Sequence, residues 1–242
     1  MNEYEKKCYE RDGFVIIKNI LPKQECKELV KQIDPIIRKN RNKIGNSNRN
    51  RKIQGMCITG TNNIQQPIKG KYRKWSAIYE NPRLQKIIDE IHPRKRWRWN
   101  YGAINGLGWI HLRFPIGKTW RPPKHGWHID DSTDKINPYK SITLLPIIHD
   151  IKKGGGGTAL YRGSHHKISY WIHNLQNKIS LDDYITKTVN DAKNNDMENE
   201  IIEATGEEGD LLLMHPNLVH SASICGKHHK TRITFNLSIY NE

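Results

Sequence analysis

The chain has 242 residues, and its 40 lysines and arginines outnumber its 25 aspartates and glutamates, which gives a formal net charge of +15 at pH 7. Hydrophobic residues make up 36% of the sequence, and the longest uncharged apolar stretch, residues 142–148, is far shorter than the roughly 20 residues of a membrane-spanning helix. Seven tryptophans argue against a disordered basic tail. We therefore expect no membrane span and a single folded domain over residues 1–242.

The first residues, MNEYEKKCYERDGF, alternate in charge and lack the apolar region of a secretory signal. The four cysteines form no C-x-x-C pair, so the sequence predicts neither a disulfide framework nor a cysteine zinc site. Both observations favour a reducing, cytoplasmic location.

Residues 1–95 are predicted to be a mostly helical N-terminal part. A β-rich run at 14–17 follows a turn at Asp12-Gly13, and apolar residues at helical spacing over 26–37 predict an amphipathic helix whose end is obscured by Pro35. Residues 38–52, RKNRNKIGNSNRNRK, are strongly basic with a single apolar residue, a composition that predicts a mobile loop. Asn81-Pro82 then starts a second helix, whose expected apolar face is Leu84, Ile87, Ile88 and Ile91.

Residues 96–242 differ from this in composition, because short runs rich in aromatic and β-branched residues alternate with Gly, Pro and Asn. The runs are WRWNYGAI, GWIHLRF, GWHID, SITLLPII, TALY, DLLLM and TRITFNLSIY. Many short strands at this spacing predict an antiparallel sandwich or barrel. A polar segment at about 168–200 is predicted to be a helical or irregular insertion between strands.

The segment Gly126-Trp127-His128-Ile129-Asp130 carries the most chemical information. Alternate side chains of a strand share a face, so His128 and Asp130 are expected to point the same way. A His-x-Asp pair with one distant histidine is the facial triad of non-haem Fe(II) oxygenases, which leaves coordination positions open. The distant ligand we predict is His220, in HPNLVHSAS.

Arg232 and Thr234 occupy alternate positions of the run TRITFN. A guanidinium can bind a carboxylate through two hydrogen bonds, and a hydroxyl two residues on can add another. This pair suits the distal carboxylate of 2-oxoglutarate. Upstream, GGGGTALYRGSH is predicted to be a glycine turn, a strand and a second turn; no Gly-Lys-Ser/Thr follows, which argues against a phosphate-binding loop.

With these motifs in place, the chain resembles the phytanoyl-CoA dioxygenase family of Fe(II)- and 2-oxoglutarate-dependent oxygenases. The resemblance runs nearly end to end, through ERDGFVIIKNILPKQECKELVKQID, YENPRLQKIIDEI, GWHIDDS, GGGGTALYRGSHH, GDLLLMHPNLVHSAS and TRITFN. Tyr161-Arg162 departs from the family's apolar residue and proline before Gly-Ser-His, and the basic segment 38–52 is also unusual. Both departures lie on the side expected to face the substrate.

The resemblance implies a mainly β protein with flanking helices, built on a double-stranded β-helix core of the jelly-roll or cupin type over residues 96–242. It implies iron ligands His128, Asp130 and His220, with Arg232 and, in a less fixed part of the pattern, Thr234 for 2-oxoglutarate. The cofactors are then Fe(II), 2-oxoglutarate and O2, and ascorbate is a candidate reductant. Because family members that halogenate have a small residue in place of the aspartate, Asp130 favours hydroxylation.

Several alternatives stay open at the level of sequence. His215 competes with His220 as the distal ligand, and Asp131 is expected on the opposite strand face from Asp130. His111 and Arg113 alternate in GWIHLRFP and are candidate substrate contacts, or they lie on a solvated face.

The substrate class is also open. The positive charge, concentrated at 38–52, 69–74 and 94–98, attracts polyanions in general. We expect a small-molecule substrate, anionic or an acyl thioester. The same chemistry on a nucleic acid, or a non-catalytic cupin-like binding module, are the alternative interpretations.

Overall fold

A computed structural model describes residues 1–47, 55–58, 76–92, 96–99, 109–116, 119–130, 140–194 and 200–241. Within these ranges no helix is long and apolar enough to cross a membrane. The predictions for Asp131 and for residues 48–52, 69–74 and 94–95 lie outside the described ranges.

The N-terminal helices begin where their capping residues predict. Helix α1 (Glu3–Asp12) starts with a reciprocal capping box: the Asn2 side chain accepts from the Glu5 backbone N–H, and the Glu5 side chain accepts from that of Asn2, both at 2.8 Å. Helix α4 (Pro82–Ile91) is capped by Asn81, and Leu84 and two isoleucines of its predicted apolar face are buried. The sequence analysis correctly located α4 but missed α1.

Helix α2 (Lys23–Ser47) is longer than predicted. The mobile loop expected at 38–52 is wrong for residues 38–47, which are helical, and Pro35 lies inside the helix instead of ending it. The first half is anchored by the fully buried Cys26, Leu29 and Ile33. Because lysine and arginine are good helix formers, a helix nucleated there extends through a polar segment without needing an apolar face.

The larger sheet of the described chain has the strand order β1-β9-β6-β12-β4-β2, with β3 also paired to β12. Its members are β1 (Phe14–Ile17), β2 (Gly55–Ile58), β3 (Trp97–Trp99), β4 (Trp109–Arg113), β6 (Lys140–Pro146), β9 (Leu211–Met214) and β12 (Arg232–Asn241). All of these pairings are antiparallel.

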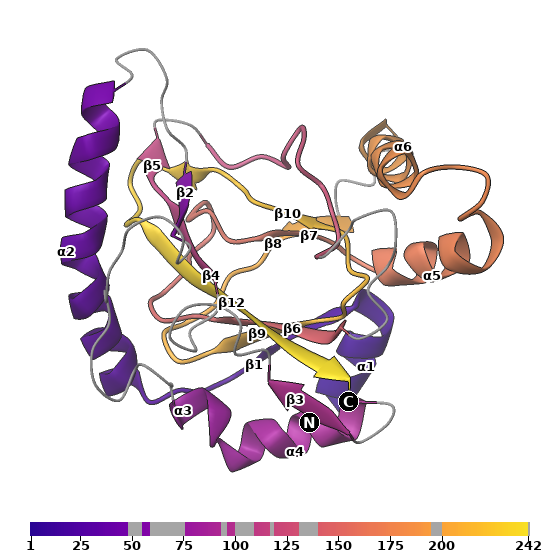
Figure 1. Cartoon of the computed structure of the whole chain (residues 1–242), viewed down its shortest axis with the longest axis horizontal. Helices are drawn as coiled ribbons and strands as arrows, with labels where there is room; N and C mark the ends of the chain where they lie inside the picture. The colour runs from indigo at the N-terminus through magenta and orange to yellow at the C-terminus, as the bar shows by residue number, and fades with distance from the viewer. Residues whose placement is uncertain are drawn as a thin grey trace.

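A smaller sheet, β10-β7-β8, faces the larger one across the interior (Figure 1). It consists of β7 (Ala159–Tyr161), β8 (Ile201–Glu203) and β10 (His220–Ser221), and a parallel pair joins β5 (Pro115–Ile116) to β11 (Cys225–Gly226). Two antiparallel sheets closing on each other form a double-stranded β-helix, which confirms the predicted fold class.

Strand β12 shows how the sheet separates an apolar exterior layer from a polar interior. Ile233, Phe235, Leu237 and Ile239 pack into the hydrophobic core that also contains residues of α2 and α4. The intervening positions face the other way, into the barrel, and begin with Arg232. The strand therefore delivers polar side chains to the interior while its other face holds the helices.

The predicted insertion at 168–200 is helical in its described part, with α5 (Ser164–Asn174) and α6 (Leu181–Asn194). Apolar residues of both helices share a core with the smaller sheet, including the fully buried Ile185 and Val189. The remaining short helix, α3 (Ser76–Tyr79), precedes α4. Helices thus cover the outer face of each sheet, and the barrel interior lies between the sheets (Figure 1).

Candidate active site

His128 and His220 lie side by side on neighbouring backbone segments. They form an antiparallel bridge in which the N–H of each donates to the carbonyl of the other, at 3.0 and 2.9 Å. Directly opposed residues of an antiparallel pair project from the same face, and the two imidazole ring centroids are 4.5 Å apart. The pairing brings together two histidines that are 92 positions apart in sequence.

The segment that carries His128 is held by the helical insertion and by a glycine turn. The Trp127 indole and the Lys193 ammonium of α6 both donate to the Pro123 carbonyl, each at 2.9 Å. Gly126 has φ +80°, a left-handed conformation that L side chains rarely adopt. This turn fixes the direction in which His128 leaves the backbone.

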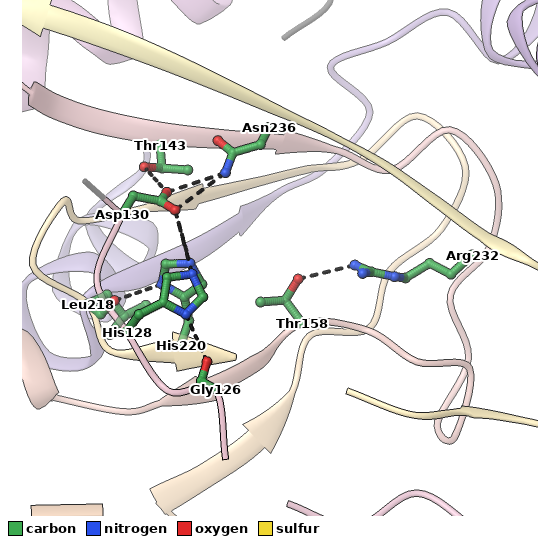
Figure 2. Close-up of polar contacts among 9 residues, drawn as sticks. All are labelled: Gly126, His128, Asp130, Thr143, Thr158, Leu218, His220, Arg232 and Asn236. Carbon is green, nitrogen blue, oxygen red and sulfur yellow. Dashed lines mark hydrogen bonds and ion pairs between the residues drawn. The ribbon is translucent and has the colours of Figure 1, made fainter. Parts of the chain in front are cut away.

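Both imidazoles are oriented by backbone carbonyls. The Nδ1 atom of His128 is 2.8 Å from the Gly126 carbonyl oxygen, and that of His220 is 2.9 Å from the Leu218 carbonyl oxygen. When Nδ1 donates to a carbonyl, the tautomer is fixed and Nε2 presents its lone pair. Two lone pairs are thereby directed at the space in front of Asp130 (Figure 2).

Asp130 completes the cluster. Its Oδ1 is 3.3 Å from the His220 Nε2 and 4.0 Å from the His128 Nε2. On its other side, Oδ2 accepts from the Thr143 hydroxyl at 3.0 Å and from the Asn236 amide at 3.4 Å. One ligand atom from each of the three residues lies within 4.8 Å of the others. Two imidazoles and one carboxylate at this spacing suit a divalent transition metal and leave positions free for other ligands.

Arg232 lies in the same interior, on β12 (Figure 2). Its side chain is 3% exposed, and Nη1 donates to the hydroxyls of Thr234 at 2.8 Å and Thr158 at 3.2 Å. The Nε atom has no hydrogen-bond partner among the described residues, and no described carboxylate forms an ion pair with this guanidinium. Burial, and then the nearby Arg113, lower the pKa of Arg232 to about 9. A buried cation of this kind is a site for an anion.

His111 and Arg113 of β4 lie opposite Thr234 and Arg232 in the strand register. Burial lowers the pKa of His111 to about 4, and the charges of Arg232 and Arg113 add to the effect. His111 is therefore a neutral imidazole at physiological pH. The register places both sequence candidates beside the buried arginine, away from the outer, helix-covered face of the sheet.

The competing histidine lies elsewhere. His215 packs against Tyr9 of α1 and against His165 of α5, with ring centroids 6.2 and 4.9 Å away. Its Nδ1 accepts from the Asn217 N–H at 3.1 Å. It belongs to a histidine cluster between α1 and α5, outside the group formed by His128, Asp130 and His220.

Four polar residues that orient the site or its neighbouring turn were missed by the sequence analysis. Thr143, Asn236 and Thr158 orient Asp130 and Arg232, and only the strand register reveals them. The fourth, Glu203, accepts from the backbone N–H groups of Gly154, Gly156 and Gly157 at 2.6 to 2.9 Å. Because this carboxylate fills the glycine turn, the turn is structural, as its sequence predicted.

The sequence profile of the phytanoyl-CoA dioxygenase family matches residues 9–224. The chain belongs to this family. Phytanoyl-CoA dioxygenase family members are Fe(II)- and 2-oxoglutarate-dependent oxygenases, so the chain is an enzyme of this class. No curated protein matches it by sequence search.

Solved structures of other oxygenases share the family fold. The carbocyclase SnoK of nogalamycin biosynthesis is 14% identical, with a TM-score of 0.57 over all of this chain and 84% of SnoK. Iron-bound EctD from S. alaskensis is 13% identical, with a TM-score of 0.57 over all of this chain and 76% of EctD. HygX from Streptomyces hygroscopicus, with nickel and 2-oxoglutarate bound, is 13% identical, with a TM-score of 0.56 over all of this chain and 87% of HygX. At these identities, the likeness establishes the double-stranded β-helix fold.

Proposed function

We propose that the chain hydroxylates an anionic small molecule, with Fe(II) held by His128, Asp130 and His220 and with 2-oxoglutarate held by Arg232. The observation that carries this proposal is the placement of a buried guanidinium, which forms no ion pair with a described carboxylate, in the same interior as the three ligand atoms. The family profile match ends at residue 224, so the role of Arg232 depends on geometry and on the sequence pattern.

The donor set fits Fe(II). The carbonyls behind both imidazoles hold Nε2 as the ligand atom, and the Thr143 hydroxyl holds Oδ2 of Asp130 so that Oδ1 faces the histidines. Bound Fe(II) supplies activation of O2, with 2-oxoglutarate as the source of electrons. The protein positions the ligands before metal arrives, which lowers the cost of assembling the site.

Arg232 supplies the charge for the distal carboxylate of 2-oxoglutarate. Its two hydroxyl partners, Thr158 and Thr234, fix the guanidinium in one orientation. A carboxylate bound to it gains charge-assisted hydrogen bonds in a site shielded from water, where such bonds are strong. The bound carboxylate thereby neutralises the positive charge of the buried guanidinium.

We assign substrate binding to His111 and Arg113. Both are on the interior side of β4, so a second anionic group can approach Arg113 while the neutral imidazole of His111 takes part in a hydrogen bond. Support for a small molecule comes from EctD, one solved structure of which contains 2-oxoglutarate with 5-hydroxyectoine. Ascorbate would maintain the reduced metal.

The test is succinate formation from 2-oxoglutarate by the purified protein with Fe(II), O2 and ascorbate. Pools of acyl thioesters, amino acids and oligonucleotides are then added separately. The proposal expects stimulation by an anionic small-molecule pool and loss of turnover in Asp130→Ala, with His173→Ala on the exposed face of α5 as the unaffected control. Full turnover in Asp130→Ala contradicts the metal assignment, and stimulation by oligonucleotides alone contradicts the substrate class.

A further inference from the structure

A basic groove lies outside the barrel, between α2 and the loops that follow β6 and β11. Two hollows of about 500 and 690 Å³ share five lining residues and so lie next to each other, and we describe them together as the groove. The shared residues are Lys27, His149, Glu208, His229 and Lys230. In Figure 1, α2 runs along the flank of the larger sheet beside the start of β12. Each hollow alone has the size of a small-molecule site.

The groove is separate from the oxygenase site. Ile233 lines it, and successive residues of a strand point to opposite faces, so Arg232 points away from it into the barrel. The His149 Nε2 accepts from the Ile233 backbone N–H at 3.0 Å and forms part of the wall. A ligand in this groove would lie on the opposite side of β12 from 2-oxoglutarate.

Five lysines line the groove. Lys23, Lys27 and Lys31 are spaced four residues apart on α2, so they form a row on one helix face with about 6 Å between successive positions. Lys152 and Lys230 belong to the two loops. Among the described residues, no ion pair engages any of the five ammonium groups.

Acidic residues are fewer and one is already engaged. Asp34, Asp150 and Glu208 line the groove against the five lysines. The Asp150 carboxylate accepts from the Glu208 backbone N–H at 3.0 Å. Histidines 228 and 229 lie in the same hollow as Lys23 and Lys152. The excess of cations is concentrated in the smaller hollow.

The larger hollow has an apolar side formed by Val30, Pro115 and Ile233. The groove therefore offers ammonium donors in both hollows and an apolar wall in the larger one. A single carboxylate would neutralise one lysine, whereas a phosphate group presents several oxygens and more charge to several ammonium groups. An organic phosphate fits this combination better than a bare inorganic phosphate, because its apolar part can contact Val30, Pro115 and Ile233.

We propose that this groove binds a phosphorylated small organic molecule, with its phosphates on Lys23, Lys27, Lys152 and Lys230 and its apolar part against Val30 and Ile233. This site is additional to the proposed oxygenase function and does not depend on it. Lys23 and Lys27 on α2 contact the phosphates from one side, and Lys152 and Lys230 in the loops contact them from the other.

The test is fluorescence titration with a fluorescent adenosine diphosphate, competed by unlabelled ADP, inorganic diphosphate, 2-oxoglutarate and a 12-base-pair DNA duplex. The expected result is saturable one-to-one binding, displaced by ADP at lower concentration than by inorganic diphosphate and not displaced by 2-oxoglutarate. The double variant Lys27→Ala and Lys230→Ala should weaken binding at least tenfold. The matched control, Lys187→Ala on the exposed face of α6, should leave it unchanged.

Four outcomes would overturn the proposal. An absence of saturable binding by the folded wild-type protein rules out the site, and equal weakening by Lys187→Ala means that attraction is spread over the whole basic surface. Displacement by 2-oxoglutarate places the probe in the barrel. Preferential displacement by the duplex assigns the groove to nucleic acid. Circular dichroism of each variant establishes that a loss of binding is not a loss of fold.

Discussion

Replacing Arg232 by methionine separates two effects of the buried guanidinium. One is its effect on the stability of the ligand-free protein, and the other is its contribution to the binding of 2-oxoglutarate. In the ligand-free protein, removal of the charge relieves the desolvation that lowers its pKa to about 9, so Arg232→Met should be no less stable to thermal unfolding than wild type. In the complex, the distal carboxylate of 2-oxoglutarate loses a charge-assisted pair of hydrogen bonds. Each such bond contributes about 1.5 to 3 kcal/mol.

After allowance for the hydroxyl of Thr234, which remains as a donor, the loss in binding should be about 3 to 4 kcal/mol, or two to three decades in the Kd for 2-oxoglutarate. The assay is calorimetric titration of Mn(II)-loaded protein under argon. Arg98→Met is the matched control, because Arg98 is an exposed arginine on β3, which also pairs with β12. A Kd for Arg232→Met within threefold of wild type would refute the assignment of this guanidinium to 2-oxoglutarate.

Three further predictions test the supporting structure. Thr143→Val and Asn236→Leu should each weaken metal binding about 10- to 100-fold while the fold is kept, because both residues hold the Asp130 carboxylate. Competition with a chelating dye measures the metal affinity of each variant, and an unchanged affinity would contradict the prediction. The pKa of His215 is lowered by burial to about 4, so below pH 6.5 the unfolded chain binds more protons than the folded protein does. The unfolding free energy should therefore fall by about 2 kcal/mol from pH 7.5 to 5 on account of this residue. Urea unfolding of wild type and His215→Gln at the two pH values checks the difference, and equal losses in both would show that other groups are responsible. Gly13→Ala should destabilise the protein by about 2 kcal/mol or more in the same assay, because φ is +80° and the added Cβ would lie 2.5 Å from a histidine ring of α5; a neutral effect would contradict the close approach.

The sequence correctly predicted which residues share a face wherever strand alternation or helical spacing indicates it. Alternation along TRITFN predicted that Arg232 and Thr234 share a face, and in the structure the two side chains form a hydrogen bond. The apolar positions of α4 were likewise readable from helical spacing. Alternation also put His128 and Asp130 together, although this segment forms only an isolated bridge.

The failures have physical causes of two kinds. Composition alone suggested a loop at 38–52, whereas helix propagation from the buried first half of α2 determines the structure of residues 38–47. The residues around Asp130 and Arg232 could not be found because Thr143, Asn236 and Thr158 come from three different strands or loops. Only the sheet register brings them to the site.

The most direct test of the central claim is the Fe(II) stoichiometry of the purified protein after anaerobic reconstitution and removal of free metal. The account predicts one Fe(II) per chain in wild type and in Asp182→Ala, an exposed aspartate of α6, and almost none in Asp130→Ala. Retention of one tightly bound Fe(II) by folded Asp130→Ala would contradict the account, because the metal would then be held without the carboxylate ligand.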